Sequence, residues 1–206
     1  MISLPTFVLF LGASLVLVLI PGPNHFYIAA RGLAQGRRAG LASAFGVEAG
    51  TLVHIGLAAA GLSYLITKSA TLFAIVKWAG VAYLVYLGIR AFTGKENGDA
   101  AQAPPPQPLG KVFLEGVLVN VLNPKVTLFF LAFLPQFVRP SAGSPALQVL
   151  LLGVALLVLG LIFDLVYAFT AGALGSRLAG RARALRHFSG VVYLGLGLVT
   201  ALAGRK

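Results

Sequence analysis

Apolar stretches of spanning length alternate with short polar segments along almost the whole chain. A bilayer core of ~30 Å takes about 20 residues of α-helix. The apolar stretches cover residues 4–30, 39–66, 72–92, 112–138, 146–172 and 188–203. This pattern predicts an all-α membrane protein with six transmembrane helices.

Prolines interrupt the first and the fourth of these segments. The first contains Ile-Pro-Gly-Pro-Asn at residues 20–24, and the fourth contains Asn-Pro-Lys at residues 123–125. A proline has no backbone N–H, so the carbonyl one turn earlier in a helix loses its hydrogen-bond partner. Non-helical backbone at membrane depth is tolerated only where protein or a water-filled cavity surrounds it. We therefore expect both breaks to line a cavity, and such a pair of broken helices points to a transporter's binding site.

The residues at the two breaks form the predicted substrate-binding set. Freed carbonyls and the amides of Asn24 and Asn123 can hold an ammonium group. Lys125, ~20 Å into its segment at 1.5 Å per residue, is expected near mid-depth. Its ammonium can bind a substrate carboxylate or pair with a carboxylate of the protein, and the sequence does not separate these roles. The full set is Pro21, Gly22, Pro23, Asn24, Asn120, Asn123, Pro124 and Lys125.

Each half of the chain holds three of the six segments, so the second half must enter the membrane inverted relative to the first. Both halves place a broken helix first and an acidic residue in the helix that follows. This arrangement is typical of secondary transporters built from two inverted repeats. The predicted three-helix repeats are residues 1–93 and 111–206. A polar, Pro-rich linker at residues 94–110 joins them and is expected to be extended.

Two of the five acidic residues, Glu48 and Asp164, lie within predicted spans. An ionisable group there costs about 2.5–3.5 kcal/mol on insertion scales and is by default a functional candidate, with a polar contact between helices as the alternative. Glu115 follows Lys111 by four residues near a helix start, where an ion pair along the helix is expected.

Glu48, Thr51 and His54 follow one another at three-residue steps and form a short polar stripe on one helix. Because a histidine titrates near neutral pH, we predict Glu48, Asp164 and His54 as the residues of proton coupling, with polar packing as the alternative for His54. His25 directly follows the first break and can carry protons or instead cap freed carbonyls.

Small residues recur at four-residue spacing in two of the predicted helices. Such spacing lets a second helix approach closely. An acidic residue within such a series is expected to face protein and not lipid. The positions are Gly46 and Gly50 in the second segment and Gly160, Asp164, Ala168 and Gly172 in the fifth.

Composition excludes several other classes of protein. With 58% hydrophobic residues, 10% charged residues and a mean hydropathy of +0.92, the chain is too apolar for an ordinary soluble domain. The absence of cysteine excludes disulfides, thiolate chemistry and cysteine-ligated metals. The net charge of +11 does not indicate nucleic-acid binding, because the basic residues lie in short gaps between apolar segments. No cofactor or metal is predicted.

Lysine and arginine are distributed unevenly between the two sides of the predicted membrane. When Arg90 and Lys77, near the two ends of the third segment, are counted with the gaps beside them, ten lie after the first, third and fifth segments, including a predicted basic loop at residues 31–38, and five lie on the other side. The positive-inside rule places those three gaps and the linker in the cytoplasm and both termini outside. The sequence leaves open whether the chain forms a homodimer.

Two alternative functions belong to other classes of membrane protein, an enzyme and a channel. An intramembrane enzyme needs a nucleophile with a base, or a metal cluster, and no His-x3-His or Glu-x2-His pairing lies within a span. A passive channel for small solutes is the second reading. Sensitivity of the flux to a protonophore distinguishes a driven carrier from a channel.

Taken together, these motifs resemble the LysE/RhtB family of amino-acid exporters. They are the two breaks, the basic Gly-rich stretch after the first, Gly46-x3-Gly50-x3-His54, Lys-Trp-Ala-Gly-Val-Ala-Tyr at 77–83 and Leu-Pro-Gln-Phe at 134–137. The resemblance covers all six segments. It implies export of amino acids or related metabolites across a bacterial inner membrane, driven by the proton-motive force through antiport with protons. The chain looks closer to the RhtB branch, whose members favour neutral amino acids.

Overall fold

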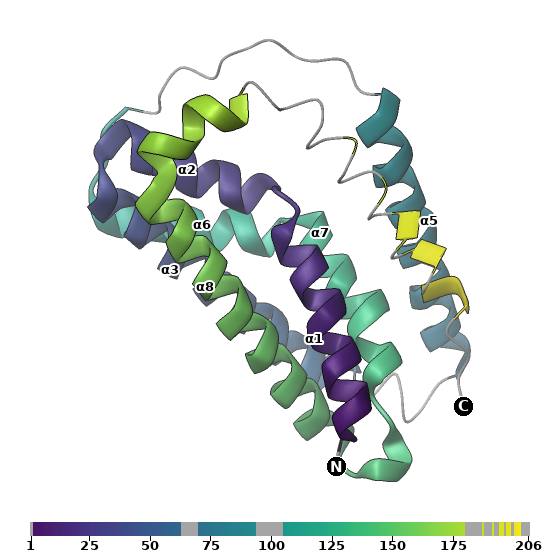
Figure 1. Ribbon diagram of the computed structural model, residues 1–206. Coiled ribbons are helices and arrows are strands. Elements are labelled where there is room, and N and C mark those ends of the chain that lie inside the picture. The colour runs from purple at the N-terminus through teal and green to yellow at the C-terminus, as the bar shows by residue number, and fades with distance from the viewer. Residues whose placement is uncertain are drawn as a thin grey trace.

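The computed structural model describes residues 2–62, 70–93 and 105–179, with isolated positions between 187 and 202. The elements assigned in these ranges are helices, and the described part of the chain contains no strand. Figure 1 shows α1 (Leu4–Leu19) beside α8 (Pro145–Ala179), with α3 (Arg37–Leu57) packed against α8. Helix α5 (Ala70–Thr93) lies along the opposite side, where it contacts the π-helical segment η2 (Phe129–Phe133).

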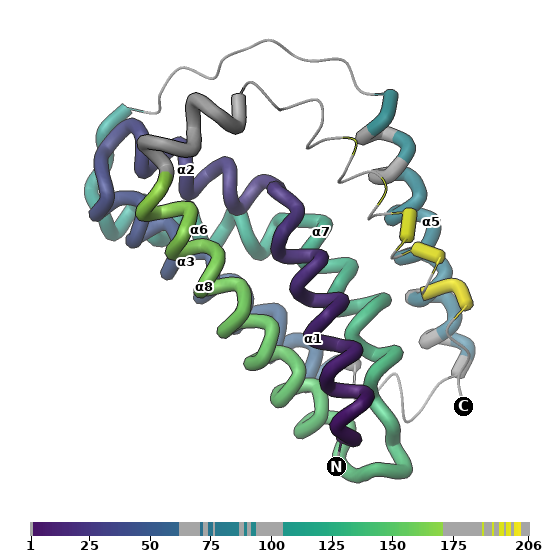
Figure 2. The backbone as a smooth tube through the Cα atoms, in the orientation of Figure 1, coloured from purple at the N-terminus to yellow at the C-terminus, as the bar shows by residue number. Residues whose placement is uncertain are grey.

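The first broken helix consists of α1 and α2 (Pro23–Gln35). Ile20 has extended backbone, as expected for a residue that precedes a proline. Pro23 occupies the first turn of α2, where an N–H would have no helical partner in any case. The axes of α1 and α2 are bent by 49°, and Figure 2 shows this bend in the purple part of the backbone.

The second broken helix consists of α6 (Leu109–Val121) and α7 (Pro124–Leu128), and α7 continues through η2 into the short 3-10 helix η3 (Leu134–Phe137). Asn123 precedes Pro124 with extended backbone, and its side chain accepts a hydrogen bond from the Lys125 N–H. The bend at this break is 47°. Both interruptions predicted from the prolines are therefore present.

Two single helices are long and apolar enough to cross a membrane, at Arg37–Gly61 and Pro145–Thr170. The first of these includes most of the π-helical segment η1 (Ala58–Leu62) that extends α3. The two bent pairs satisfy the same test when each is taken as one span, which gives up to four spans within the described residues. The predicted sixth segment, residues 188–203, lies mostly outside the described residues, and the arrangement of six helices in two inverted repeats stays a prediction.

The predicted basic loop at residues 31–38 is wrong. Helix α2 continues through Arg31 to Gln35, and α3 begins at Arg37. The whole turn is made at Gly36, whose φ of 80° favours glycine. In the second half of the chain, the short 3-10 helix η4 (Pro140–Ala142) lies in the connection between η3 and α8.

Glu115 does not form the ion pair predicted with Lys111. Its carboxylate pairs with Arg31, with Nη2 at 2.7 Å from Oε2, so the bond joins α6 to α2 and does not run along α6. The sequence spacing favoured a local partner, whereas the packing of α2 against α6 supplies a closer one. Helix α6 begins at Leu109, inside the predicted linker at 94–110, and residues 94–104 lie outside the described part.

Small residues bring α3 into close contact with α6 on one side and α8 on the other. A Cβ at Gly46 would overlap the backbone of Phe113 in α6, and a Cβ at Gly50 would come within 2.7 Å of the Asn120 Cβ. On the α8 side, a Cβ at Gly40 would lie 3.3 Å from the Ala168 Cα. The close helix contacts predicted from the four-residue spacing are confirmed for Gly46, Gly50 and Ala168. Helix α3 is thus the central element that holds α6 and α8 in place.

Candidate functional site

The two breaks contact each other directly. The Lys125 ammonium group, at the start of α7, donates a hydrogen bond of 2.8 Å to the Ile20 carbonyl at the end of α1. The Asn123 amide donates a bond of the same length to the Asn24 Oδ1 at the start of α2. Residues about 100 positions apart in the sequence therefore meet, as the inference from the prolines requires.

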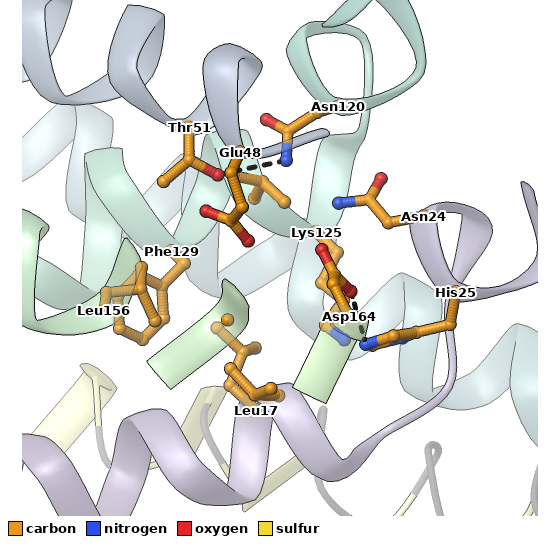
Figure 3. Close-up of a pocket in the computed structure, with 13 residues that line it drawn as sticks. Leu17, Asn24, His25, Glu48, Thr51, Asn120, Lys125, Phe129, Leu156 and Asp164 are labelled. Carbon is orange, nitrogen blue, oxygen red and sulfur yellow. Dashed lines mark hydrogen bonds and ion pairs between the residues drawn. The ribbon is translucent and has the colours of Figure 1, made fainter. Parts of the chain in front are cut away.

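A cavity of about 60 Å³ lies beside this junction, which is space for several water molecules or part of a small solute. Helices from both halves of the chain supply its walls (Figure 3). The lining residues are Leu17, Val18, Asn24, His25, Glu48, Thr51, Asn120, Lys125, Val126, Phe129, Leu156, Gly160 and Asp164.

Glu48 places a buried carboxylate in the cavity. Its side chain is on α3, the residue is 7% exposed, and Oε2 has no hydrogen-bond partner within the described structure. Oε1 faces Gly160 of α8, where an added Cβ would lie only 2.6 Å away. Buried polar atoms in native structures nearly always have partners, so this oxygen can accept a hydrogen bond from a bound solute or from a proton on the neighbouring Asp164 carboxyl group.

Asp164 on α8 is 3% exposed and forms the second carboxylate of the cavity. The His25 Nε2 lies 3.5 Å from its Oδ1. His25 Nδ1 accepts the Gly22 N–H at 3.2 Å, so the ring proton of a neutral His25 is on Nε2 and faces Asp164. Lys125, 7% exposed, also interacts electrostatically with Asp164. Figure 3 shows His25, Lys125 and Asp164 gathered on one side of the cavity.

Asn120 and Thr51 form a polar wall beside Glu48. The Asn120 amide donates a hydrogen bond of 3.2 Å to the Thr51 hydroxyl. The backbone carbonyl of Asn120 has no helical partner because of Pro124. It accepts the Asn123 N–H at 2.9 Å and also contacts the His54 Nε2 at 3.3 Å. His54 stacks on Phe130 with ring centroids 5.5 Å apart and does not line the cavity.

The predicted site residues divide into those that line the cavity and those that shape the backbone around it. Five of the predicted residues line it: Asn24, Glu48, Asn120, Lys125 and Asp164. The other six lie behind or beside the lining: Pro21, Gly22, Pro23, His54, Asn123 and Pro124. Asn123 in particular uses both ends of its side chain within the protein, as the N-cap of α7 and as donor to Asn24.

Sequence reasoning missed several lining residues. Of the two roles predicted for His25, the capping of carbonyls is wrong, because its Nδ1 caps the Gly22 N–H and its Nε2 reaches Asp164. Its role as a proton carrier stays a prediction. Its place three residues after Gly22, at the position of a reciprocal cap, is the signal that identifies it. The apolar wall carried no signal, because leucine, valine and phenylalanine are common everywhere in this chain. Its members are Leu17, Val18, Val126, Phe129 and Leu156.

The described part of the chain has no cluster of three or more histidine, cysteine, aspartate or glutamate residues that could hold a metal ion. The charged side chains of the cavity can bind a small polar solute, and its carboxylates and imidazole are groups that can exchange protons.

Comparisons with known proteins agree with this description. A family model for LysE type translocators matches residues 15–204. The chain is 32% identical to the homoserine/homoserine lactone efflux protein of Salmonella typhimurium, over 94% of this chain and 95% of that protein. It is 33% identical to an uncharacterised membrane protein of Pseudomonas aeruginosa, over 90% of each chain, and 30% identical to one of Vibrio cholerae, over 94% of this chain and 95% of that protein. No solved structure matches significantly.

Proposed function

The chain belongs to the LysE type translocator family and is a multi-pass membrane transporter, not an enzyme, and from this premise we propose that it exports small amino acids or related metabolites. A relative over nearly its whole length is named as an efflux protein for homoserine and homoserine lactone. We place the chain in the bacterial inner membrane, with both termini outside and the inter-repeat linker in the cytoplasm.

The observation that carries the proposal is the buried Glu48 carboxyl group, whose Oε2 has no donor among the described residues, in a cavity bounded by two broken helices. In our proposal the substrate ammonium binds between Glu48 and the Asn120–Thr51 wall. Asn123 is not part of this subsite, because its amide is already bonded to Asn24.

The substrate carboxylate binds at the opposite side of the cavity in this proposal. The Lys125 ammonium group can exchange its hydrogen bond to the Ile20 carbonyl for one to the substrate carboxylate. The new bond is stronger because both groups are charged. The N-terminus of α2, which begins beside the cavity at Asn24 and His25, adds the positive end of a helix dipole. The substrate side chain would lie against the apolar wall around Phe129 and Leu156.

The proton-motive force drives export in this proposal, and Asp164 or Glu48 exchanges the proton. The two carboxyl groups are in hydrogen-bond contact with each other, so a change of charge on one affects the protonation of the other. We expect Asp164→Asn to abolish gradient-driven transport in proteoliposomes, because an amide cannot release a proton. Unchanged transport would remove Asp164 from the coupling.

A panel of labelled amino acids in everted vesicles tests the function itself. We expect uptake of small neutral amino acids into vesicles that contain the protein, and collapse of that uptake when a protonophore is added. Uptake that does not saturate and is insensitive to the protonophore would favour the alternative of a passive channel. If the vesicles take up no member of the panel, the proposal is wrong.

A further inference from the structure

A second buried polar cluster lies away from the cavity, toward the other end of α2. Arg31 is 4% exposed, and its guanidinium donates to the Glu115 carboxylate of α6. The Tyr27 hydroxyl donates to the Val112 carbonyl at 2.7 Å and contacts the same Glu115 oxygen at 3.2 Å. The Arg31 guanidinium carbon also lies 5.7 Å from the centre of the Tyr27 ring. These contacts connect α2 of the first half to α6 of the second.

The residues just before α6 join the same cluster. Arg31 Nη1 donates to the Pro105 carbonyl at 3.0 Å, and the Gln35 amide donates to the Gln107 carbonyl at 2.8 Å. The end of the segment between the two halves is therefore tied to α2. We call the set Tyr27, Arg31, Gln35, Pro105, Gln107, Val112 and Glu115 the Arg31 cluster.

Helix α2 is joined to its neighbours in the chain by non-helical backbone at both ends. Residues 20–22 separate it from α1, and Gly36 with its φ of 80° separates it from α3. A helix between two such joints can turn as a rigid body, because a few residues at its ends absorb the change in backbone angles. The contacts of its side chains therefore decide where it lies.

The position of α2 determines the shape of the cavity. Its first turn supplies Asn24 and His25 to the lining, and its length packs against α3, α6 and α8. Those three helices carry Glu48, Asn120 and Asp164. His25 and Arg31 are six residues apart, or ~9 Å along the helix axis, so a tilt that separates Arg31 from Glu115 also moves His25 relative to Asp164.

We propose that the Arg31 cluster is a latch that positions α2 over the cavity, and that its release opens the cavity during transport. The inference rests on the proposed function, since only a transporter needs such an opening. The Arg31–Glu115 pair suits reversible contact because the Glu115 side chain is 30% exposed, and water can take the place of Arg31 when the pair opens. Because the first gap and the linker are predicted to be cytoplasmic, the latch closes the cytoplasmic entrance.

Access to a cysteine in the cavity tests the latch without measuring transport. The chain contains no native cysteine, so Leu17→Cys introduces a single thiol into the apolar wall. In membranes, we measure the rate at which a small, charged thiosulfonate reagent modifies this cysteine. The rate is compared between the Leu17→Cys variant and the double variant that also carries Arg31→Gln. We expect a rate about fivefold higher or more when the latch is broken. The matched control is Ser141→Cys in the exposed loop before α8, whose rate should not respond to Arg31→Gln.

The charge-exchanged pair Arg31→Glu with Glu115→Arg guards against a simple folding defect. It should return the Leu17→Cys rate toward the value of the intact latch, whereas Arg31→Glu alone should not. The milder Tyr27→Phe, which removes only the hydroxyl bonds, should raise the rate by a smaller factor. If the Leu17→Cys rate is the same with and without Arg31, the latch is wrong. That result would leave the proposed export function untouched, because the amino-acid panel measures export separately.

Discussion

Gly160 determines where the Glu48 carboxylate can lie. The residue is one turn before Asp164 on α8 and presents bare backbone to Glu48 Oε1. A larger residue there would compete with the carboxylate for the same space. We therefore expect Gly160 to affect transport through the position of the Glu48 carboxylate and not through its own contact with a substrate.

We predict that Gly160→Ala lowers the rate of gradient-driven transport by about tenfold or more, because displacements near 1 Å at a site can cost about a hundredfold. Alanine stabilises a helix by up to ~1 kcal/mol relative to glycine. A lower transport rate of Gly160→Ala would therefore not be explained by a less stable helix. Transport by purified protein in proteoliposomes measures the effect.

Gly56→Ala is the matched control on α3. An added Cβ at Gly56 meets no atom within 4 Å, so this variant should transport at the unmodified rate. Equal rates for the Gly160 and Gly56 variants would show that Glu48 does not depend on the space at Gly160.

The charged residues of the cavity could be predicted from the sequence because burial of a charge in a membrane is costly and rare. Glu48, Asp164 and Lys125 were identified on that ground, and all three line the cavity. His25 could be named but not given its contact, because its partner Asp164 is 139 positions away (164 − 25). The apolar wall could not be predicted, since a leucine that faces a cavity and one that faces lipid look the same in the sequence.

At the scale of elements, Asn123 holds the second break together. Its Oδ1 caps the first turn of α7 at the Lys125 N–H, and its Nδ2 crosses to Asn24 in α2. One side chain therefore both starts α7 and ties it to the first half of the chain. The Asn-Pro dipeptide predicted the break, but not this bridge between the breaks.

We predict that Asn123→Ala and Asn123→Ser separate these two roles. Alanine removes the cap and the bridge, and the loss of an N-cap costs about 1 kcal/mol of stability. Serine can still cap the helix but is too short to reach Asn24, so it should retain most of the thermal stability of the purified protein. Both variants should show weakened substrate binding if the bridge positions Asn24. Full stability of Asn123→Ala would mean that the cap contributes little.

The prediction of the elements was accurate where proline set the boundary and poor where side-chain pairing did. Helix α1 ends at Leu19, shortly before Pro21, and α6 ends at Val121, shortly before Pro124, as the chemistry of proline requires. The basic stretch at residues 31–38 was predicted as a loop because arginine favours water. Arg31 is nevertheless helical and buried, because Glu115 compensates its charge. No local sequence pattern indicates that Arg31 has a partner 84 residues away.

Within the described residues, the two halves of the chain share the order of their first elements. A helix pair bent by 49° is followed by α3 with Glu48, and a pair bent by 47° is followed by α8 with Asp164. If the second set enters the membrane inverted, each half contributes one break and one carboxylate to a cavity at mid-depth. Neither half could then form the cavity alone, and alternating access would require one half to move relative to the other.

The inverted arrangement makes a prediction about the two sides of the membrane that single cysteines can test. Ser141→Cys lies in the exposed loop between the second broken helix and α8, and Gly110→Cys lies at the exposed start of α6, where an added Cβ meets no atom within 4 Å. The positive-inside rule places the first outside and the second in the cytoplasm. A membrane-impermeant maleimide should therefore label Ser141→Cys in intact cells and Gly110→Cys only after permeabilisation. The opposite pattern would reverse the orientation, and the Arg31 cluster would then close the outer entrance. Labelling of both positions in intact cells would mean that the second broken helix does not cross the membrane, and the inverted repeat would have to be abandoned.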